Sequence, residues 1–183
     1  MTGVCLLRGV NVGGHAKLPM PAFRTLLEEL GARDVRTYVQ SGNAVFDHAL
    51  PAEAVRLRIS AALAEQFGLM PEVLVLGAPE LAEVVAAQPF AHDDPADAGA
   101  LHVGFFVRPP GEDAALVAGD TGVAGRDEFV LGERAAYVRC PDGFGRTKLS
   151  GGYFERLLGV PVTFRNWRTV LTLAETARVT SAS

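Results

Sequence analysis

The stretch Val4-Cys5-Leu6-Leu7-Arg8-Gly9-Val10-Asn11-Val12-Gly13-Gly14-His15-Ala16-Lys17 decides how the fold begins. Its short apolar run, Val4–Val10, predicts a buried strand. A glycine-rich loop follows, and Pro21 then stands where proline is favoured, in the first turn of a helix. The sequence therefore predicts a strand, a loop and a helix in succession.

Working outward from this start, the first half reads as a β-α-β-β-α-β order. Apolar residues at helical spacing alternate with short strand-like runs, and glycines or a Ser41-Gly42-Asn43 turn separate them. After the first strand the segments are a helix over 21–30, strands over 35–39 and 45–46, a helix over 55–67 and a strand over 73–76. This order is the ferredoxin-like split pattern.

The second half repeats this order less clearly. Its segments are a strand over 103–107, a weak helix over 114–118, a hairpin of 129–131 with 136–139, a helix over 153–158, a strand over 162–164 and a C-terminal helix. That last helix carries Trp167, Val170, Leu171, Ala174 and Ala177, which we expect on one face. We therefore predict an α+β fold of two ferredoxin-like halves with an additional C-terminal helix. The expected domains are residues 1–87 and 100–183, with 88–99 as a linker.

Composition favours a soluble protein. Hydrophobic residues make up 49% of the 183 positions, which suffices for a core. No apolar run is long enough to span a bilayer, and no basic region precedes the first apolar run as in a signal peptide. Two cysteines, Cys5 and Cys140, suggest reduced thiols rather than a disulfide framework. We expect a cytoplasmic protein without membrane contact.

Charge is distributed unevenly along the chain. The net charge of −4 argues against long-range attraction of nucleic acid by the whole surface. Residues 1–27 nevertheless hold three basic residues and no acid, and residues 144–168 hold five basic residues and one acid. Residues 80–128 hold ten acids and two basic residues. Lysine occurs at two positions, Lys17 and Lys148, one in each basic segment, although a preference for arginine would also explain so few lysines.

The first candidate site is the glycine loop between Arg8 and Lys17. Glycines let backbone N–H groups turn toward an anion, a helix N-terminus adds partial positive charge, and the two basic side chains add charge-assisted hydrogen bonds. It is not a Walker loop, because His15 and Ala16 follow Gly14. Its expected ligand-binding residues are Arg8, Asn11, Gly13, Gly14 and Lys17. The alternative is a connection whose glycines only turn the chain.

Two further segments could join this site. Gln40, Ser41 and Asn43 form a hairpin turn that the split fold can bring close to the glycine loop, although turn chemistry alone also explains them. Arg146 and Lys148 follow an Asp-Gly turn, and Thr147 there can cap the next helix; the alternative is a solvated turn. We expect both basic segments to face one cleft.

Catalytic and metal-binding patterns are largely missing from the sequence. It has no CxxC pair, and its four histidines do not have metal-ligand spacing. His15 is the one acid–base candidate because it lies within a motif. Near the C-terminus, Trp167 is expected in the core and Asn166 as a helix N-cap. We expect no metal and no cofactor.

Several segments carry a family likeness, namely Leu7–Gly14, Lys17–Met20, Val35–Asn43, Pro141–Gly143, Arg146–Leu149 and Arg165–Val170. Together they resemble a bacterial family, the domain of unknown function DUF1697. Within them Thr147 stands where the family typically has Ser, and Arg168 where it has Asn. The resemblance implies a small cytosolic α+β protein and no particular activity.

Three functions follow from these observations. The first is binding of a phosphate-bearing ligand, a nucleotide or nucleic acid, through the cationic loop; nucleic acid would be held by its backbone, because the strands lack a stacking platform. The second is a small phosphohydrolase, by analogy with acylphosphatases, in which Gln40 or Asn43 would orient water. The third is a protein-interaction module without a small ligand.

Overall fold

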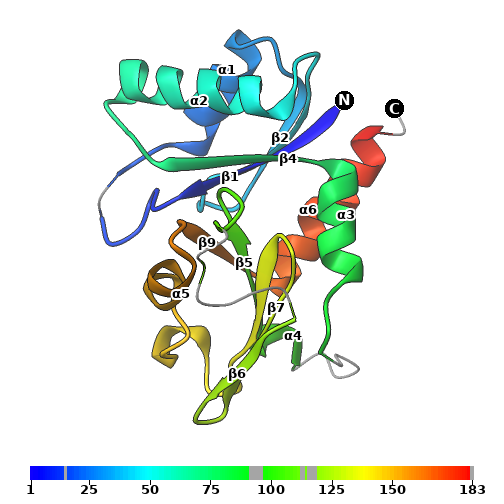
Figure 1. Ribbon diagram of the computed structural model, residues 1–183. Helices are drawn as coiled ribbons and strands as arrows, with labels where there is room; N and C mark the ends of the chain where they lie inside the picture. The colour runs from blue at the N-terminus through cyan, green and yellow to red at the C-terminus, as the bar shows by residue number, and fades with distance from the viewer. Residues whose placement is uncertain (15, 91–96, 112–113, 115–118, 182–183) are drawn as a thin grey trace. The chain divides into compact units, whose positions relative to one another are not determined.

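Figure 1 shows the computed structural model, which describes the chain except residues 15, 91–96, 112–113, 115–118 and 182–183. The described residues form a mixed α+β structure with two antiparallel sheets. They divide into two compact units, one of Met1–Ala82 with Thr172–Ser183 and one of Glu83–Leu171. The C-terminal part of the last helix is thus grouped with the first strands. The sequence-based domains, 1–87 and 100–183 around a linker at 88–99, stay a prediction about independently folding parts.

The first unit is built on a four-stranded sheet. Its elements are β1 Thr2–Arg8, α1 Met20–Glu29, β2 Arg33–Tyr38, β3 Asn43–Asp47, α2 Ala52–Phe67, β4 Glu72–Gly77 and the start of α3 Ala78–Ala86. The strand order is β2-β3-β1-β4, and every neighbouring pair is antiparallel. Helices α1 and α2 lie on one face, where they enclose a core with alternate residues of β1 and β3 (Figure 1). The predicted order of helices and strands in this half is therefore present.

Both covering helices end at glycines in the left-handed region. Gly31 follows α1 with φ of 89°, and Gly68 caps α2 with φ of 63°. The Gly68 N–H donates to the carbonyl of Ala64, which satisfies a carbonyl at the end of the helix. Glycine takes this conformation without the steric cost of a Cβ, so it sets where each helix stops.

The second unit is built on a five-stranded sheet of order β6-β7-β8-β5-β9, again antiparallel throughout. Its elements are the end of α3, α4 Asp97–Ala100, β5 Leu101–Phe106, β6 Thr121–Ala124, β7 Asp127–Leu131, β8 Ala135–Arg139, the 3-10 turn η1 Phe144–Arg146, α5 Gly151–Leu158, β9 Val162–Asn166 and the start of α6 Trp167–Ser181. Strands β7-β8-β5-β9 have the same relative order as β2-β3-β1-β4. The ferredoxin-like classification of the two halves stays a prediction.

Strand β6 is an element that the sequence pattern does not predict. It contains one large apolar residue, Val123, and that side chain is 74% exposed. Glycine is needed at position 122 because a Cβ there would lie 2.4 Å from the ring of Phe129 on the neighbouring strand. The predicted helix over 114–118 falls outside the described residues, apart from Ala114.

Helix α6 corrects one prediction about its buried face. Trp167, Val170, Leu173 and Ala177 are buried, whereas Leu171 is exposed. The buried positions repeat every three or four residues, which is the helical period, and Leu171 is rotated away from them. The predicted stripe was therefore wrong in including Leu171.

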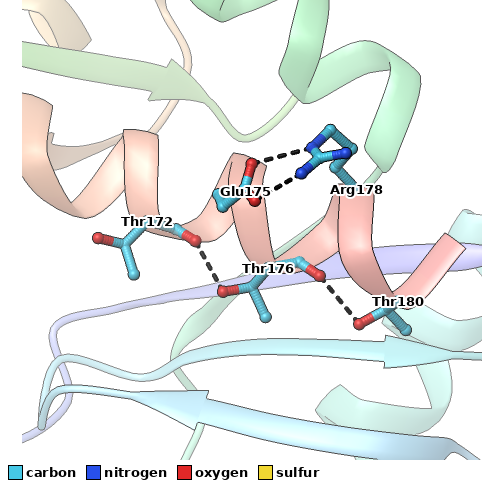
Figure 2. A network of polar contacts seen from close by, with 5 residues as sticks. All are labelled: Thr172, Glu175, Thr176, Arg178 and Thr180. Carbon is cyan, nitrogen blue, oxygen red and sulfur yellow. Dashed lines mark hydrogen bonds and ion pairs between the residues drawn. The ribbon is translucent and has the colours of Figure 1, made fainter. Parts of the chain in front are cut away.

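The C-terminal part of α6 carries a run of threonines (Figure 2). The Thr176 hydroxyl donates to the carbonyl of Thr172, and the Thr180 hydroxyl donates to the carbonyl of Thr176. Each hydroxyl donates to a carbonyl of the same helix, so the donor of the buried Thr180 is paired. Further along, the Ser181 hydroxyl bonds to Thr2, whose hydroxyl donates to the carboxylate of Asp47.

Two expectations from composition concern thiols and membranes. Cys5 and Cys140 are both free and buried. Among the described residues, no helix has both the length and the apolar character that a bilayer crossing requires.

Candidate functional site

The loop after β1 is a chain of left-handed backbone positions at the surface. Positive φ angles occur at Gly9 (79°), Asn11 (56°), Gly13 (60°), Gly14 (79°) and Ala16 (48°). All of these residues are at least partly exposed. Alternation of left-handed with other conformations turns successive N–H groups to one side, and such concave backbone segments bind anions.

Asn11 holds this loop closed. Its Nδ2 donates to the carbonyls of Leu18 and Gln40, each at 2.8 Å, and its Oδ1 accepts from the Leu18 N–H at 2.8 Å. Its backbone N–H donates to Ala16 at 3.0 Å. The two donated side-chain bonds use both N–H groups of the amide, and the backbone N–H is also bonded, so Asn11 shapes the loop and has no N–H left for a ligand.

The hairpin turn between β2 and β3 lies against this loop. The Leu7 N–H donates to the carbonyl of Gly42 at 2.8 Å, and Asn11 bonds Gln40 as described. A Cβ at Gly42 would lie 2.7 Å from both Leu7 Cβ and Val10 Cγ2. The glycine loop and the hairpin turn are therefore brought together, as expected from the strand order.

The three polar side chains of the turn differ in exposure. Asn43 is fully buried, and its Nδ2 donates to the Tyr38 carbonyl and the Ser41 hydroxyl. Any part that Asn43 plays in binding is therefore indirect, through the shape of the turn. Ser41 is half-buried and engaged with Asn43, whereas Gln40 is exposed.

Arg8 and Lys17 occupy different surroundings. Arg8 ends β1 opposite Glu72 of β4, and both residues line an open hollow of about 380 Å³. Its other lining residues are Gly9, Ala16, Leu69, Met70 and Pro71. Lys17 is exposed at the end of the loop. The hollow thus contains one basic and one acidic residue, which favours a ligand of mixed polarity over a bare anion at this particular spot.

The N-terminus of α1 offers fewer N–H donors to an anion than the sequence suggested. Pro19 precedes the helix and Pro21 lies in its first turn, and neither has an N–H. The Phe23 N–H donates back to the carbonyl of Pro19. Fewer free donors therefore remain at this N-terminus than at an ordinary helix, and the backbone of the loop is the better anion site.

The second basic motif lies in the other unit. Arg146 ends η1 and Lys148 follows it, and both residues are exposed. The Thr147 hydroxyl accepts from the Leu149 N–H at 3.0 Å, so it closes a local turn, and Ser150 rather than Thr147 precedes α5. The helix-capping role expected for Thr147 is therefore wrong. That the two basic motifs face one cleft stays a prediction.

An aromatic stack accompanies this second motif. The ring of His102 stacks on Phe144 with centroids 4.3 Å apart, and Phe144 contacts Phe164 at 4.8 Å. Burial lowers the pKa of His102, and the carbonyl of Ala100 near its ring opposes that shift. Burial likewise raises the pKa of the Cys140 thiol, which argues against a reactive thiolate there.

The residues before α6 have structural roles. Arg165 is buried, and its Nη1 donates to the Thr163 hydroxyl and the Phe164 carbonyl. Asn166 Oδ1 accepts from the Thr169 N–H at 2.8 Å, which confirms the predicted N-cap. Trp167 is buried, as expected.

Metal-binding and acid–base candidates are few. In the part of the chain that the structure describes, no three residues among His, Cys, Asp and Glu gather as a metal would require. His15, the acid–base candidate, lies outside the described residues.

Sequence reasoning missed the acid at the candidate site. Glu72 begins β4 and stands directly across from Arg8. The ferredoxin-like interpretation of the first half implies that its last strand pairs with its first, and that pairing was the available signal. The register that brings these two residues together depends on packing over the whole sheet.

Comparison with known proteins places this chain in a family. The model of DUF1697, a protein family of unknown function, matches residues 1–137. The chain belongs to the DUF1697 family. The match covers the glycine loop and the hairpin turn, and the basic motif at 146–148 lies beyond it. No curated protein sequence matches the chain significantly.

A solved structure has the same fold as this DUF1697 protein. It is the conserved bacterial protein SP0830 from Streptococcus pneumoniae, with a TM-score of 0.68 and 20% sequence identity. The alignment covers 96% of this chain and 98% of the other. At this identity the likeness establishes the fold alone.

Proposed function

We propose that this DUF1697 protein binds a phosphate-bearing ligand at the glycine loop, residues 8–17. The observation that carries the proposal is the loop backbone between two basic residues, Arg8 and Lys17, which turns repeatedly through left-handed conformations and is exposed at Gly9, Gly13 and Gly14. The Asn11 bonds fix this backbone before a ligand arrives, so less conformational entropy is lost on binding.

The ligand class follows from the donors that the loop offers. Backbone N–H groups and a flexible lysine suit a phosphate oxygen, because each is a donor without an acceptor. Gln40, exposed and linked to the loop through Asn11, can extend the site toward the sugar or base of a nucleotide. Glu72 beside Arg8 disfavours a second phosphate in the adjacent hollow.

The test is a titration of the full chain with inorganic phosphate, pyrophosphate, ATP and a short single-stranded oligonucleotide, followed by amide NMR at low salt. We expect shifts at the loop amides and at least a tenfold weaker affinity in Lys17→Gln. Arg24→Gln is the matched control, because Arg24 pairs with Glu28 on the surface of the same unit. Absence of binding at millimolar ligand, or equal loss in both variants, would contradict the proposal.

A phosphohydrolase is the second candidate, favoured by the contact between the loop and the hairpin turn. The ferredoxin-like interpretation of the sheet order supports the analogy with acylphosphatases. Because Asn43 is buried, Gln40 is the side chain left to orient a water molecule. Hydrolysis of acetyl phosphate that is lost in Gln40→Ala and Arg8→Ala supports this candidate, and turnover that survives both excludes it.

A further inference from the structure

A separate, mostly apolar hollow lies in the first unit. It measures about 220 Å³, and its lining includes Leu27, Leu30, Phe46, His48, Val55 and Arg58. These residues come from α1, β3 and α2 and the segments that follow α1 and β3. An apolar cavity of about 150 Å³ admits benzene, so this space suits a molecule of one ring.

His48 gives this apolar lining a polar group. The residue is only 6% exposed, and neither ring nitrogen has a hydrogen-bond partner among the described residues. Its ring packs against Phe46, with centroids 5.6 Å apart, and against Gly3, where a Cβ would lie 2.8 Å from Nε2. A buried imidazole without partners is costly, and a ligand oxygen would supply the missing bond.

The charged groups near His48 differ in sign. Burial lowers the pKa of His48 and the nearby N-terminal ammonium reinforces this shift. The Asp47 carboxylate and the backbone of Leu50 oppose it, although the Leu50 backbone does not reach hydrogen-bond geometry with either ring nitrogen. The net direction favours a neutral ring, which has one donor and one acceptor.

Arg58 carries a positive charge at the hollow, whereas the His48 ring is neutral. It is exposed on α2, and among the described residues no carboxylate forms an ion pair with it. Arg56, two residues earlier, is instead held by Glu53 at 2.7 and 2.6 Å. A guanidinium beside an apolar cavity suits a carboxylate attached to an apolar body.

We propose that this hollow binds a small carboxylic acid with one compact apolar ring, of the size of benzoate. Arg58 contacts the carboxylate, the apolar side chains of α1 and α2 enclose the ring, and His48 hydrogen-bonds to a carboxylate oxygen. The site is distinct from the glycine loop and does not depend on the function proposed for it.

The experiment uses the full chain, with benzoate and benzyl alcohol as probes. Calorimetry gives the affinities, and ¹⁵N NMR of the histidine side chains reports on the His48 ring. We expect benzoate to bind at millimolar concentration or tighter, to bind better than benzyl alcohol and to shift the His48 ring nitrogens. Arg58→Gln is expected to weaken benzoate at least tenfold and to leave benzyl alcohol within about twofold, because only benzoate has a carboxylate.

Two variants make the assignment specific. Arg56→Gln is the matched control, since it removes a cation from the same helix outside the lining, and it should leave benzoate affinity within about twofold. Val55→Phe fills the hollow and should abolish binding of both probes. The proposal is overturned if benzoate leaves the His48 nitrogens unchanged, or if Arg58→Gln and Arg56→Gln bind it equally well.

Discussion

The side chain of Asn11 bonds both backbone polar groups of Leu18, seven residues further along the chain, with Nδ2–O and N–Oδ1 distances of 2.8 Å. A third bond, to the Gln40 carbonyl, ties the loop to the hairpin turn. Replacing Asn11 by Gly keeps the left-handed backbone and removes all three bonds. At about 0.5–1.5 kcal/mol for each bond, we expect the free energy of unfolding to fall by about 1.5–4.5 kcal/mol.

Two further variants separate the bonds of Asn11 from its backbone conformation. Asn11→Ala adds the cost of a left-handed alanine, about 1–2 kcal/mol, to the loss of the bonds. Val12→Ala changes an exposed neighbour in the same loop and should stay within about 0.5 kcal/mol of the unmodified chain. Urea unfolding followed by circular dichroism ranks the three. If Asn11→Gly unfolds like Val12→Ala, the bonds do not organise the loop.

Gly42 combines a positive φ with a close contact, so its substitution should be severe. An alanine there meets the left-handed cost of about 1–2 kcal/mol and a clash with Leu7 and Val10, worth about 1–3 kcal/mol. We expect Gly42→Ala to lower the free energy of unfolding by about 2–5 kcal/mol. Gly68→Ala, at φ of 63° with open space around it, should cost only the backbone part. Equal destabilisation of the two variants in urea would rule out the clash.

The elements of the first half were predictable because each is encoded locally. Helical spacing ends at Gly31 and Gly68, and the turn residues between β2 and β3 are typical of hairpins. The split β-α-β-β-α-β interpretation allowed the loop and the turn to lie close together, and the structure shows that they do. Strand β6 could not be predicted, because Thr121–Ala124 has no apolar alternation and is a strand through its pairing with β7.

The sequence predicted where the candidate site lies better than it predicted what each side chain does there. The glycines and basic residues mark the loop directly. The side-chain amides of Asn11 and Asn43 donate to groups of the loop and of the hairpin turn. Their partners belong to residues 18 and 40 for Asn11 and to residues 38 and 41 for Asn43. Such contacts follow from three-dimensional packing, and an exposed amide and a buried one look the same in the sequence.

The titration of His102 predicts how stability depends on pH. Burial lowers its pKa in the folded chain below the value of about 6.5 in the unfolded one. The unfolded chain therefore binds more protons, and stability present above pH 6.5 is lost as pH falls through the folded pKa. Trp167, the single tryptophan, follows the asparagine paired with His102 and reports unfolding of this sheet by fluorescence. His102→Gln should show a smaller loss between pH 7.5 and 5.5, and an unchanged loss would assign it to other groups.

Gly104 and Phe164 face each other across β5 and β9, and the ring occupies the space of the missing side chain. A Cβ at Gly104 would lie 2.5 Å from Phe164 Cζ. We expect Gly104→Ala to lower the free energy of unfolding by about 1–3 kcal/mol through overpacking. Phe164→Leu replaces the ring by a smaller side chain and should be destabilising alone. The double variant should nevertheless be more stable than the sum of the two losses predicts. The reason is that the methyl group added at position 104 fills the space that the ring leaves. A double-mutant cycle from Trp167 fluorescence measures this coupling, and strictly additive losses would show that the two residues do not compete for one space.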